Sequence, residues 1–523
     1  MRQIVLIGAG HASASVARAL RRKGFEGSIV IVGDETHPPY QRPPLSKDFL
    51  SGDAEMDEIW SVEPDWYAEN GVTLRLGTAA THIDVDTRRV TLDDGSTLEA
   101  DAVLIATGVS PRRLDGVTSA HVHYLKTLAD AQAIQAAIAP DKTLIVVGGG
   151  FIGLEIAATA RKAGAKVVVL EAGAVPLGRP LGEEIGALIA RIHEREGVDI
   201  RCNAAVRSVE DRGEGVVVHL EDGSEVAGDL VVVGIGTVPN DQIARASEIT
   251  VGNGVRVDEY GRTSAHNIFA AGDVCNHQNM LLGKRMRVEH FDNATRQAQV
   301  IAANMLGERV EFTDLPWFWS DQYDFNLQFA GSIADHDQIV LRGSVEEDDF
   351  SAFYLKDGIV IGVFGLDRGG DVMHSKTLIA EKRPVDPAAL ADDDMDIAEL
   401  VMGVPDDEDE EPVEDSAAAE DDAFRRVARS GQVTEGMARR FALDGLEIAV
   451  ARSGGQVYAI HNLCTHLACH LASGKVEGKC ITCLCHGSMF DLETGVPVNP
   501  PATRAVRTFP VREEEGQIYV KTA

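Results

Sequence analysis

The sequence lacks any hydrophobic run long enough to cross a membrane, and it is poor in positive charge. No apolar stretch in its 523 residues approaches the roughly twenty residues of a membrane-spanning helix, and its start does not read as a signal peptide. With 49 Lys and Arg against 82 Asp and Glu, the formal net charge is −33. This excess of acid argues against nucleic acid and anionic membranes as partners. We therefore expect a cytoplasmic protein that binds neither.

Cysteine is scarce before residue 464. Only Cys202 and Cys275 lie there, and residues 36–60 contain none. Thiol chemistry beside a cofactor in this part of the chain is therefore excluded, and both cysteines are interpreted as packing residues. The other five of the seven cysteines fall in the last sixty residues, which indicates metal binding rather than a disulfide scaffold.

Basic residues are absent from one long stretch. Between Asp392 and Asp422 there are sixteen acidic residues and no Lys or Arg, which accounts for about half of the charge imbalance. Residues 404–422 also contain almost no large apolar side chains. Because such a segment cannot bury a core and repels itself, we predict a flexible acidic linker at 404–422.

Two glycine-rich turns each follow an apolar strand. Strand Gln3–Leu6 leads into Gly8-Ala9-Gly10, and strand Lys142–Val147 leads into Gly148-Gly149-Gly150. Each turn opens a helical pattern, and the next strand ends on an acid. One such fingerprint is also explained by an ordinary glycine-rich turn. Two of them predict an α/β chain with two Rossmann-like dinucleotide-binding domains.

The first unit has the features of an FAD site. Gly8 permits the tight turn, Gly10 lets backbone approach a pyrophosphate, and Ala14 lets the helix pack on the strand. Asp34 or Glu35 would hold a ribose. Two further segments are typical of FAD-binding flavoproteins, Ala106-Thr107-Gly108 and Phe269-Ala270-Ala271-Gly272-Asp273. In such folds the aspartate after the glycine bonds the ribityl chain of the flavin.

The second unit has the features of an NADH site. Gly148, Gly150 and Gly153 form its turn, and Glu171 stands 23 positions after Gly148 at the end of a strand. A carboxylate there accepts a hydrogen bond from the ribose 2′-OH and repels a 2′-phosphate. We therefore predict NADH rather than NADPH.

The pattern changes after Pro316. Short alternating strands at 339–342, 351–354 and 359–364 predict a smaller α+β domain, and the chain beyond Phe424 reads as β-rich. The predicted FAD-binding domain has two parts, 1–112 and 244–315, with an NADH-binding domain at 113–243 between them. A reductase C-terminal domain at 316–403, the linker at 404–422 and a β domain at 423–523 follow.

Residues 1 to about 400 resemble the FAD-dependent, NADH-using ferredoxin reductases that serve bacterial oxygenases and cytochromes P450, a fold shared with apoptosis-inducing factor. The motifs that carry the resemblance are Arg42-Pro43-Pro44-Leu45-Ser46-Lys47, Gly150-Phe151-Ile152-Gly153-Leu154-Glu155, Val288-Glu289-His290-Phe291 and Pro316-Trp317-Phe318-Trp319-Ser320-Asp321-Gln322. The resemblance implies FAD contacts from Ala12, Asp34, Lys47, Ala80, Lys126, Asp273 and Phe291. Ser13, Arg42, Thr107, Gly108, Ile152 and Gly236 complete the predicted cofactor-binding set.

The resemblance also places Lys47 and Glu155 as an ion pair beside flavin N5, with Trp319 near the isoalloxazine. An ammonium there would stabilise the negative charge of reduced flavin, while the carboxylate orients the lysine or the nicotinamide. The alternative is a surface salt bridge without a catalytic role. His290-Phe291 is closer to apoptosis-inducing factor than to the usual reductase motif.

Near the end of the chain stand Cys464-Thr465-His466 and Cys483-Leu484-Cys485-His486. This spacing resembles the Rieske [2Fe–2S] signature, which implies that Cys464 and Cys483 hold one iron, and His466 and His486 the other. A structural zinc site is the alternative. The loops resemble the respiratory type, which implies a Cys469–Cys485 disulfide, with two reduced thiols as the alternative. Ser488 matches a donor to cluster sulfur, whereas Phe490 replaces the second donor, a tyrosine.

Together these features predict an NADH-dependent ferredoxin reductase. Electrons would pass from NADH through FAD to the fused cluster, and then to an external acceptor, either an oxygenase component or a cytochrome P450. The alternative is a redox-responsive interaction protein of the apoptosis-inducing-factor kind with slow NADH turnover. The sequence does not predict an oligomeric state.

Overall fold

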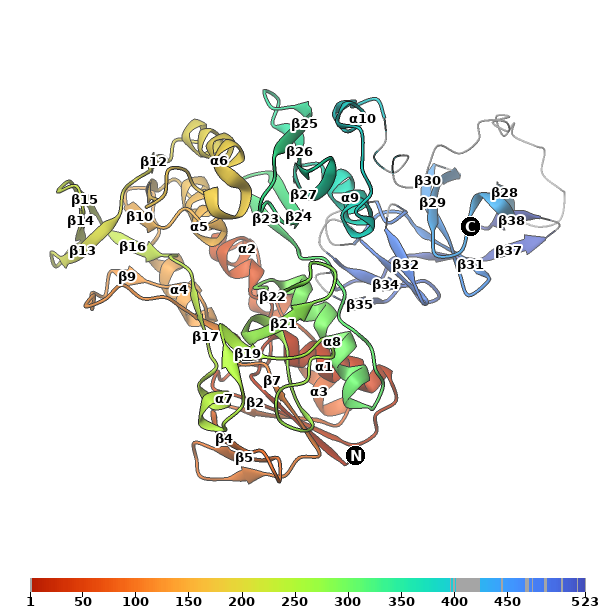
Figure 1. Ribbon diagram of the computed structural model, residues 1–523, viewed down its shortest axis with the longest axis horizontal. Coiled ribbons are helices and arrows are strands. Elements are labelled where there is room, and N and C mark those ends of the chain that lie inside the picture. Colours follow the sequence, from red (N-terminus) through yellow and green to blue (C-terminus); the bar gives the residue numbers. More distant parts are fainter. Residues whose placement is uncertain are drawn as a thin grey trace. The chain divides into compact units, whose positions relative to one another are not determined.

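The computed structural model describes residues 2–395, 397, 400, 424–443, 445–465, 470–472, 474–483, 487–499, 502–514 and 516–522. The chain divides into two compact units (Figure 1). One comprises Met1–Val340, Ala352–Asp357 and Ile361–Asp367, and the other Leu341–Ser351, Gly358–Val360 and Arg368–Ala523. None of the helices described is both long and apolar enough to span a bilayer.

The first sheet is parallel and has the order β20-β7-β1-β2-β3. Helices α1 and α8 pack together on one face, where Ala14, Ala17 and Ala298 let their backbones approach (Figure 1). Apart from the partly exposed edge strand β3, the strands are apolar and almost fully buried, as expected for a sheet covered on both faces. The elements are β1 (Gln3–Ile7), β2 (Ser28–Gly33), β3 (Val72–Leu76), β7 (Ala102–Ile105), β20 (Ile268–Ala270), α1 (His11–Arg22) and α8 (Phe291–Met305).

The second sheet repeats this arrangement with the order β12-β11-β10-β16-β9, again parallel. Both predicted dinucleotide-binding folds are therefore present. The elements are β9 (Val122–His123), β10 (Thr143–Val147), β11 (Lys166–Leu170), β12 (Asp199–Arg201), β16 (Leu230–Val233), α4 (Leu128–Ala137), α5 (Phe151–Lys162) and α6 (Gly178–Arg195), with a three-stranded sheet of β13 (Val206–Asp211), β14 (Val216–Leu220) and β15 (Glu225–Gly228).

Two antiparallel strands connect these folds, because β8 pairs with β17. Shorter sheets and helices surround the cofactor motifs. They are β8 (Val109–Pro111), β17 (Thr237–Pro239), β4 (Ala80–Asp84), β5 (Arg89–Leu92), β6 (Thr97–Leu98), β18 (Val251–Gly252), β19 (Gly254–Arg256), β21 (Cys275–Asn279), β22 (Lys284–Arg287), α2 (Asp48–Ser51), α3 (Pro64–Glu69), α7 (Gln242–Ala246), and the 3₁₀ turns η1 (Pro43–Ser46), η2 (Met56–Glu58) and η3 (Gly272–Val274).

A third large sheet begins after Pro316 and has the order β23-β24-β27-β26-β25. Each of the three strands predicted in this region lies inside a longer observed strand. The elements are β23 (Trp317–Gln322), β24 (Phe325–Gly331), β25 (Gln338–Ser344), β26 (Asp349–Lys356), β27 (Ile359–Leu366), α9 (Gly369–Glu381) and α10 (Pro387–Ala391). The predicted linker lies outside the described residues.

The chain beyond residue 424 forms three small antiparallel sheets, β28-β38-β37, β29-β30-β31-β36 and β32-β33-β34-β35. Apart from the single 3₁₀ turn η4 (Ser430–Gln432), its described elements are all strands. They are β28 (Arg425–Arg429), β29 (Ala438–Leu443), β30 (Leu446–Ser453), β31 (Gln456–His461), β32 (Lys475–Glu477), β33 (Cys480–Thr482), β34 (Met489–Asp491), β35 (Pro497–Asn499), β36 (Thr508–Phe509), β37 (Val511–Glu514) and β38 (Gln517–Val520).

Candidate functional site

Both nucleotide turns require glycine at their first position. Gly8 and Gly148 have φ angles of +107° and +105°. A Cβ at Gly8 would stand 2.2 Å from the Ala106 carbonyl oxygen, and one at Gly148 would stand 2.5 Å from the Gly234 oxygen. Backbone angle and close approach therefore both exclude a side chain here.

The second glycine of each turn leaves room for an anion. Gly10 and Gly150 are the N-caps of α1 and α5, and a Cβ at either would meet nothing within 4 Å. Within the described chain, no side chain caps either helix, and neither first turn carries an acid. The free N–H groups and the positive helix end suit a pyrophosphate. The turns thus fit the phosphates of FAD and NADH.

The third position differs between the two units. A Cβ at Gly153 would stand 2.2 Å from the Gly148 oxygen, so glycine is required there. By the same spacing the first unit has Ser13 at this position, and the neighbouring Ala14 is fully buried in one apolar cluster with Ile4 and Leu6 of β1. Among the described residues, the buried hydroxyl of Ser13 has no hydrogen-bond partner. A bound ligand is a natural partner for it.

The predicted ribose-binding acids lie at the ends of β2 and β11. Glu35 forms an ion pair of 2.5 Å with Arg42 and accepts a short hydrogen bond from Tyr40, whereas Asp34 is exposed. Glu171 accepts from two backbone N–H groups, those of Gly149 at 2.7 Å and residue 173 at 2.6 Å. These bonds fix the Glu171 carboxylate beside the second glycine turn.

Lys47 lies between two carboxylates. Its Nζ is 3.4 Å from Glu155 Oε1 and 3.1 Å from Asp321 Oδ2. The side chains of Lys47 and Glu155 are only 12% and 8% exposed, so the interpretation as a surface salt bridge is wrong. Burial acts to lower the pKa of Lys47, but the two carboxylates outweigh it and leave that pKa raised. The lysine is therefore held as an ammonium.

Two hydroxyl groups complete the surroundings of Glu155. Ser46 donates to Oε2 at 2.5 Å, and Ser320 donates to Oε1 at 2.6 Å. With Lys47, both carboxylate oxygens have partners, as burial of a charge demands. Ser46, Ser320 and Asp321 were not predicted as site residues, although all three lie inside the two motifs that contain Lys47 and Trp319.

A second, partly buried ion pair joins the predicted NADH-binding domain to the second part of the predicted FAD-binding domain. Lys126 Nζ lies 3.7 Å from Asp273 Oδ2. Burial lowers the pKa of Lys126, partly offset by Asp273, and burial raises the pKa of Asp273 against the pull of Lys126. The Lys126 backbone carbonyl also accepts from Arg42. Three of the predicted cofactor-binding residues, Arg42, Lys126 and Asp273, are therefore brought together.

Aromatic rings lie next to Lys47. His11 stacks on Phe291 with ring centroids 3.8 Å apart, and Phe291 meets Trp319 edge-on at 6.0 Å. Lys47 Nζ is 5.9 Å from the centroid of the Trp319 ring. Burial, followed by Arg18, lowers the pKa of His11 to about 3, so its ring is neutral at pH 7. Sequence reasoning missed His11, although it lies inside the first glycine turn.

The remaining predicted contacts surround these groups. Thr107 Oγ1 donates to the Asn240 carbonyl at 2.6 Å, and Asn240 Nδ2 donates back to the Thr107 carbonyl at 2.9 Å. Gly108 and Gly236 have left-handed φ angles of +67° and +99°. Three further residues lie on α1, β4 and α5 respectively: Ala12, Ala80 and Ile152.

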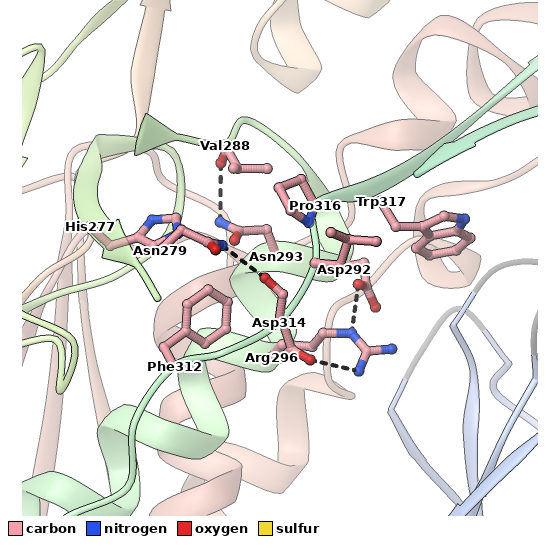
Figure 2. Close-up of a pocket in the computed structure, with 11 residues that line it drawn as sticks. His277, Asn279, Val288, Asp292, Asn293, Arg296, Phe312, Asp314, Pro316 and Trp317 are labelled. Atoms are coloured by element: carbon pink, nitrogen blue, oxygen red, sulfur yellow. Dashed lines mark hydrogen bonds and ion pairs between the residues drawn. The ribbon is translucent and has the colours of Figure 1, made fainter. Parts of the chain in front are cut away.

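A pocket next to the first turn of α8 is lined by none of the predicted site residues (Figure 2). Asn293 bonds the Val288 carbonyl at 3.1 Å, and Arg296 bonds Asp292 at 2.7 Å. The buried His277 Nε2 has no hydrogen-bond partner among the described residues. These hydrogen bonds hold the first turns of α8, the helix that begins at Phe291.

The two predicted cysteine ligands are buried in one apolar cluster. Cys464 is 3% exposed and Cys483 is 1% exposed, in loops after β31 and β33. Asn462 closes the first loop at its base, because its Oδ1 accepts from Ala472 N at 2.8 Å and its carbonyl oxygen from Leu471 N at 2.6 Å. The predicted ligands His466 and His486, and the predicted Cys469–Cys485 pair, lie outside the described residues.

Ser488 lies behind the second loop and is completely buried. Its backbone oxygen accepts from Cys483 N at 2.7 Å, and its hydroxyl oxygen accepts from Ala502 N at 2.9 Å. The hydroxyl proton is therefore directed away from Ala502, as a donor to cluster sulfur requires. The two buried thiol positions and this hydroxyl fit a [2Fe–2S] cluster.

Two dinucleotide folds, a buried Lys–Glu pair and a β domain with paired cysteine loops define a flavoprotein oxidoreductase with an iron–sulfur module. Residues 2–298 match the pyridine nucleotide-disulphide oxidoreductase family, residues 317–401 the reductase C-terminal family, and residues 423–510 the Rieske [2Fe-2S] domain. The chain belongs to the pyridine nucleotide-disulphide oxidoreductases, among the ferredoxin–NAD(+) reductases of the putidaredoxin reductase type.

Several relatives support this assignment. The chain is 38% identical to putidaredoxin reductase of Pseudomonas putida, over 76% of this chain and 96% of that protein. It is 40% identical to the ferredoxin–NAD(+) reductase component of the anthranilate 1,2-dioxygenase system of Burkholderia cepacia, over 74% and 96%. The structure of the covalent putidaredoxin reductase–putidaredoxin complex matches with a TM-score of 0.74 and 38% identity, over 76% of this chain and 98% of that one.

These matches identify an NADH-dependent reductase that uses FAD and carries a Rieske [2Fe–2S] domain. They bear out the predicted fold class, enzyme class and cofactors, and favour the reductase over the interaction protein.

Proposed function

We propose that this chain passes electrons from NADH through FAD to its own Rieske cluster, and then to an oxygenase component or a cytochrome P450. The observation that carries the proposal is the buried Lys47–Glu155 pair in a chain that also holds two buried cysteines at Rieske spacing. We also propose a cytoplasmic location, where NADH is supplied.

FAD, when bound, accepts a hydride from NADH and releases its electrons singly. The chain's residues prepare for this. The backbone N–H groups at Gly10 and Gly150 bind the two pyrophosphates, and Glu171 selects the ribose without a 2′-phosphate. Glu155 and Asp321 hold the Lys47 ammonium in place, and this ammonium would stabilise the negative charge of reduced flavin.

The oxygenase-type acceptor is supported by the relatives, whose names place them in dioxygenase systems or with putidaredoxin. Joining a ferredoxin-like module to its reductase raises its local concentration at the flavin to about millimolar if the tether spans the distance. We propose that residues 404–422 act as this tether. Stiffening the tether should slow reduction of the cluster, whereas unchanged kinetics would indicate a fixed contact.

The deciding experiment is an anaerobic NADH titration of the intact chain followed by EPR, with Cys464→Ser as the control. A reduced Rieske signal that grows as NADH is added, and that the control lacks, supports the internal route. A reduced flavin beside a cluster that stays oxidised contradicts it, and then favours the interaction protein with slow turnover.

A further inference from the structure

A line of buried polar side chains ends at Glu155. Ser320 Oγ donates to Glu155 Oε1 at 2.6 Å, and Gln322 Nε2 donates to Ser320 Oγ at 3.0 Å. Gln322 Oε1 lies 2.8 Å from His193 Nε2, and His193 Nδ1 lies 3.1 Å from the Tyr323 hydroxyl. The line crosses from α6 through β23 to α5.

The direction of every bond in this line is fixed. Gln322 Oε1 can only accept, so His193 Nε2 must carry the proton and donate. In a neutral imidazole Nδ1 then accepts, and the Tyr323 hydroxyl supplies its proton. Burial lowers the pKa of His193 to about 4, which agrees with a neutral ring. Each group therefore donates toward Glu155.

The line controls where the single Ser320 proton points. A hydroxyl with one lone pair filled by the Gln322 amide directs its own proton elsewhere, here to Glu155. Had Gln322 been turned over, its oxygen would compete with Glu155 for that proton. The Glu155 carboxylate can only accept, so Ser320 must donate to it and accept from the Gln322 amide nitrogen; His193 Nε2–H then donates to the Gln322 oxygen and stabilises this orientation. Ser320 and His193 are fully buried and Gln322 is 2% exposed, so water offers no substitute.

We propose that Ser320, Gln322 and His193 are positioning residues that fix the Glu155 carboxylate, and through it the Lys47 ammonium, for hydride transfer to the flavin. The inference rests on the proposed role of Lys47 and Glu155. It assigns a function to His193 and Gln322, two buried residues that do not contact Lys47. The support is that every hydrogen bond in the line donates toward Glu155. None of these three residues was among the predicted cofactor-binding or catalytic residues.

Two matched pairs of variants test the proposal. Gln322→Glu keeps the acceptor facing His193 but turns the donor to Ser320 into a second acceptor, whereas Gln322→Met removes both. His193→Gln keeps a donor near the Nε2 position, whereas His193→Leu does not. Each holoprotein is first checked for FAD content and thermal unfolding. The measurements are the limiting rate of flavin reduction by NADH, the apparent Kd for NADH, and the flavin midpoint potential.

The expected result is a roughly tenfold lower limiting rate in Gln322→Glu, with the NADH Kd within about twofold of the parent. The flavin potential should become more negative, because a less neutralised Glu155 holds the Lys47 charge away from reduced flavin. His193→Gln should keep the parent rate and potential, and His193→Leu should not. Equal effects of the members of both pairs, or unchanged rate and potential in folded Gln322→Glu, would overturn the proposal.

Glu155→Gln separates this inference from the function it rests on. If Glu155→Gln leaves rate and potential unchanged, the role of the Lys47–Glu155 pair is wrong. If Glu155→Gln changes both while Ser320→Ala and Gln322→Glu do not, only the positioning line is wrong. Should the Gln322 variants fail to fold, the His193 pair decides alone.

Discussion

Lys47 Nζ lies 3.4 Å from Glu155 Oε1, and the two side chains are only 12% and 8% exposed. Two residues that are 108 positions apart in the sequence thus form the charged centre of the reductase. An ion pair at this depth costs desolvation energy, so removing one partner leaves an expensive unpaired charge.

Lys47→Met should therefore lower the free energy of unfolding by about 3 kcal/mol and slow flavin reduction by NADH. Lys47→Arg should keep most of the stability, because it retains the charge between Glu155 and Asp321. Urea unfolding and stopped-flow reduction measure the two effects. A Lys47→Met protein as stable as the parent would contradict the buried pairing.

The two glycines of the first turn should respond differently to alanine. Gly8→Ala forces a Cβ to within 2.2 Å of the Ala106 oxygen at a φ of +107°, so it should destabilise the fold by about 2 kcal/mol or more. Gly10→Ala meets nothing within 4 Å, so the protein should fold but bind FAD at least about tenfold more weakly. Thermal unfolding and FAD titration distinguish them, and equal loss of stability would contradict the assignment.

The nucleotide folds were predictable because their physics is local. A strand, a glycine turn and a helix follow one another within a few residues. The predicted strands Gln3–Leu6 and Lys142–Val147 each differ by one residue at one end from the observed Gln3–Ile7 and Thr143–Val147. The β-branched runs of these strands can only be buried, so periodicity and turn residues agree.

The surroundings of Glu155 were not predictable in the same way. Ser46, His193 and Ser320 come from distant parts of the chain. Ser46 and Ser320 lie inside the quoted motifs, but nothing in those motifs shows that their hydroxyl groups meet at Glu155, and His193 lies in no motif. Only the folded sheet brings β23 against α5 and α6.

Glu171 should determine the choice of nucleotide. Its carboxylate is held by two backbone N–H groups at 2.7 and 2.6 Å, so it presents a fixed negative charge. Glu171→Gln keeps one acceptor and removes the charge that repels a 2′-phosphate. The ratio of kcat/KM for NADH over NADPH should fall by about tenfold or more. Steady-state assays with both nucleotides check this, and an unchanged ratio would place the selection elsewhere.

Ser488 should raise the potential of the Rieske cluster. Its hydroxyl oxygen accepts from Ala502 N at 2.9 Å, which leaves the proton to donate. Ser488→Ala removes that donor, so the cluster's midpoint potential should fall by on the order of tens of millivolts. Protein-film voltammetry measures it, with Ser430→Ala, on a 3₁₀ turn in the same domain, as the control. Equal potentials in Ser488→Ala and the parent would exclude the bond.

Stability should fall in acid partly through His277, in the pocket beside α8 (Figure 2). Burial, aided by Arg285, lowers the pKa of His277 from 6.5 to about 4. Between these values the unfolded chain binds a proton that the folded chain does not, so stability drops as pH falls from about 6.5 toward about 4.

The loss in the free energy of unfolding through His277 is at most about 3 kcal/mol. His277→Leu should flatten that part of the profile, at the cost near pH 7 of the 3.4 Å contact between His277 Nδ1 and Gln297 Nε2. Urea unfolding at several pH values tests this against the parent, and parallel profiles for the two proteins would show that His277 is not a source of acid lability.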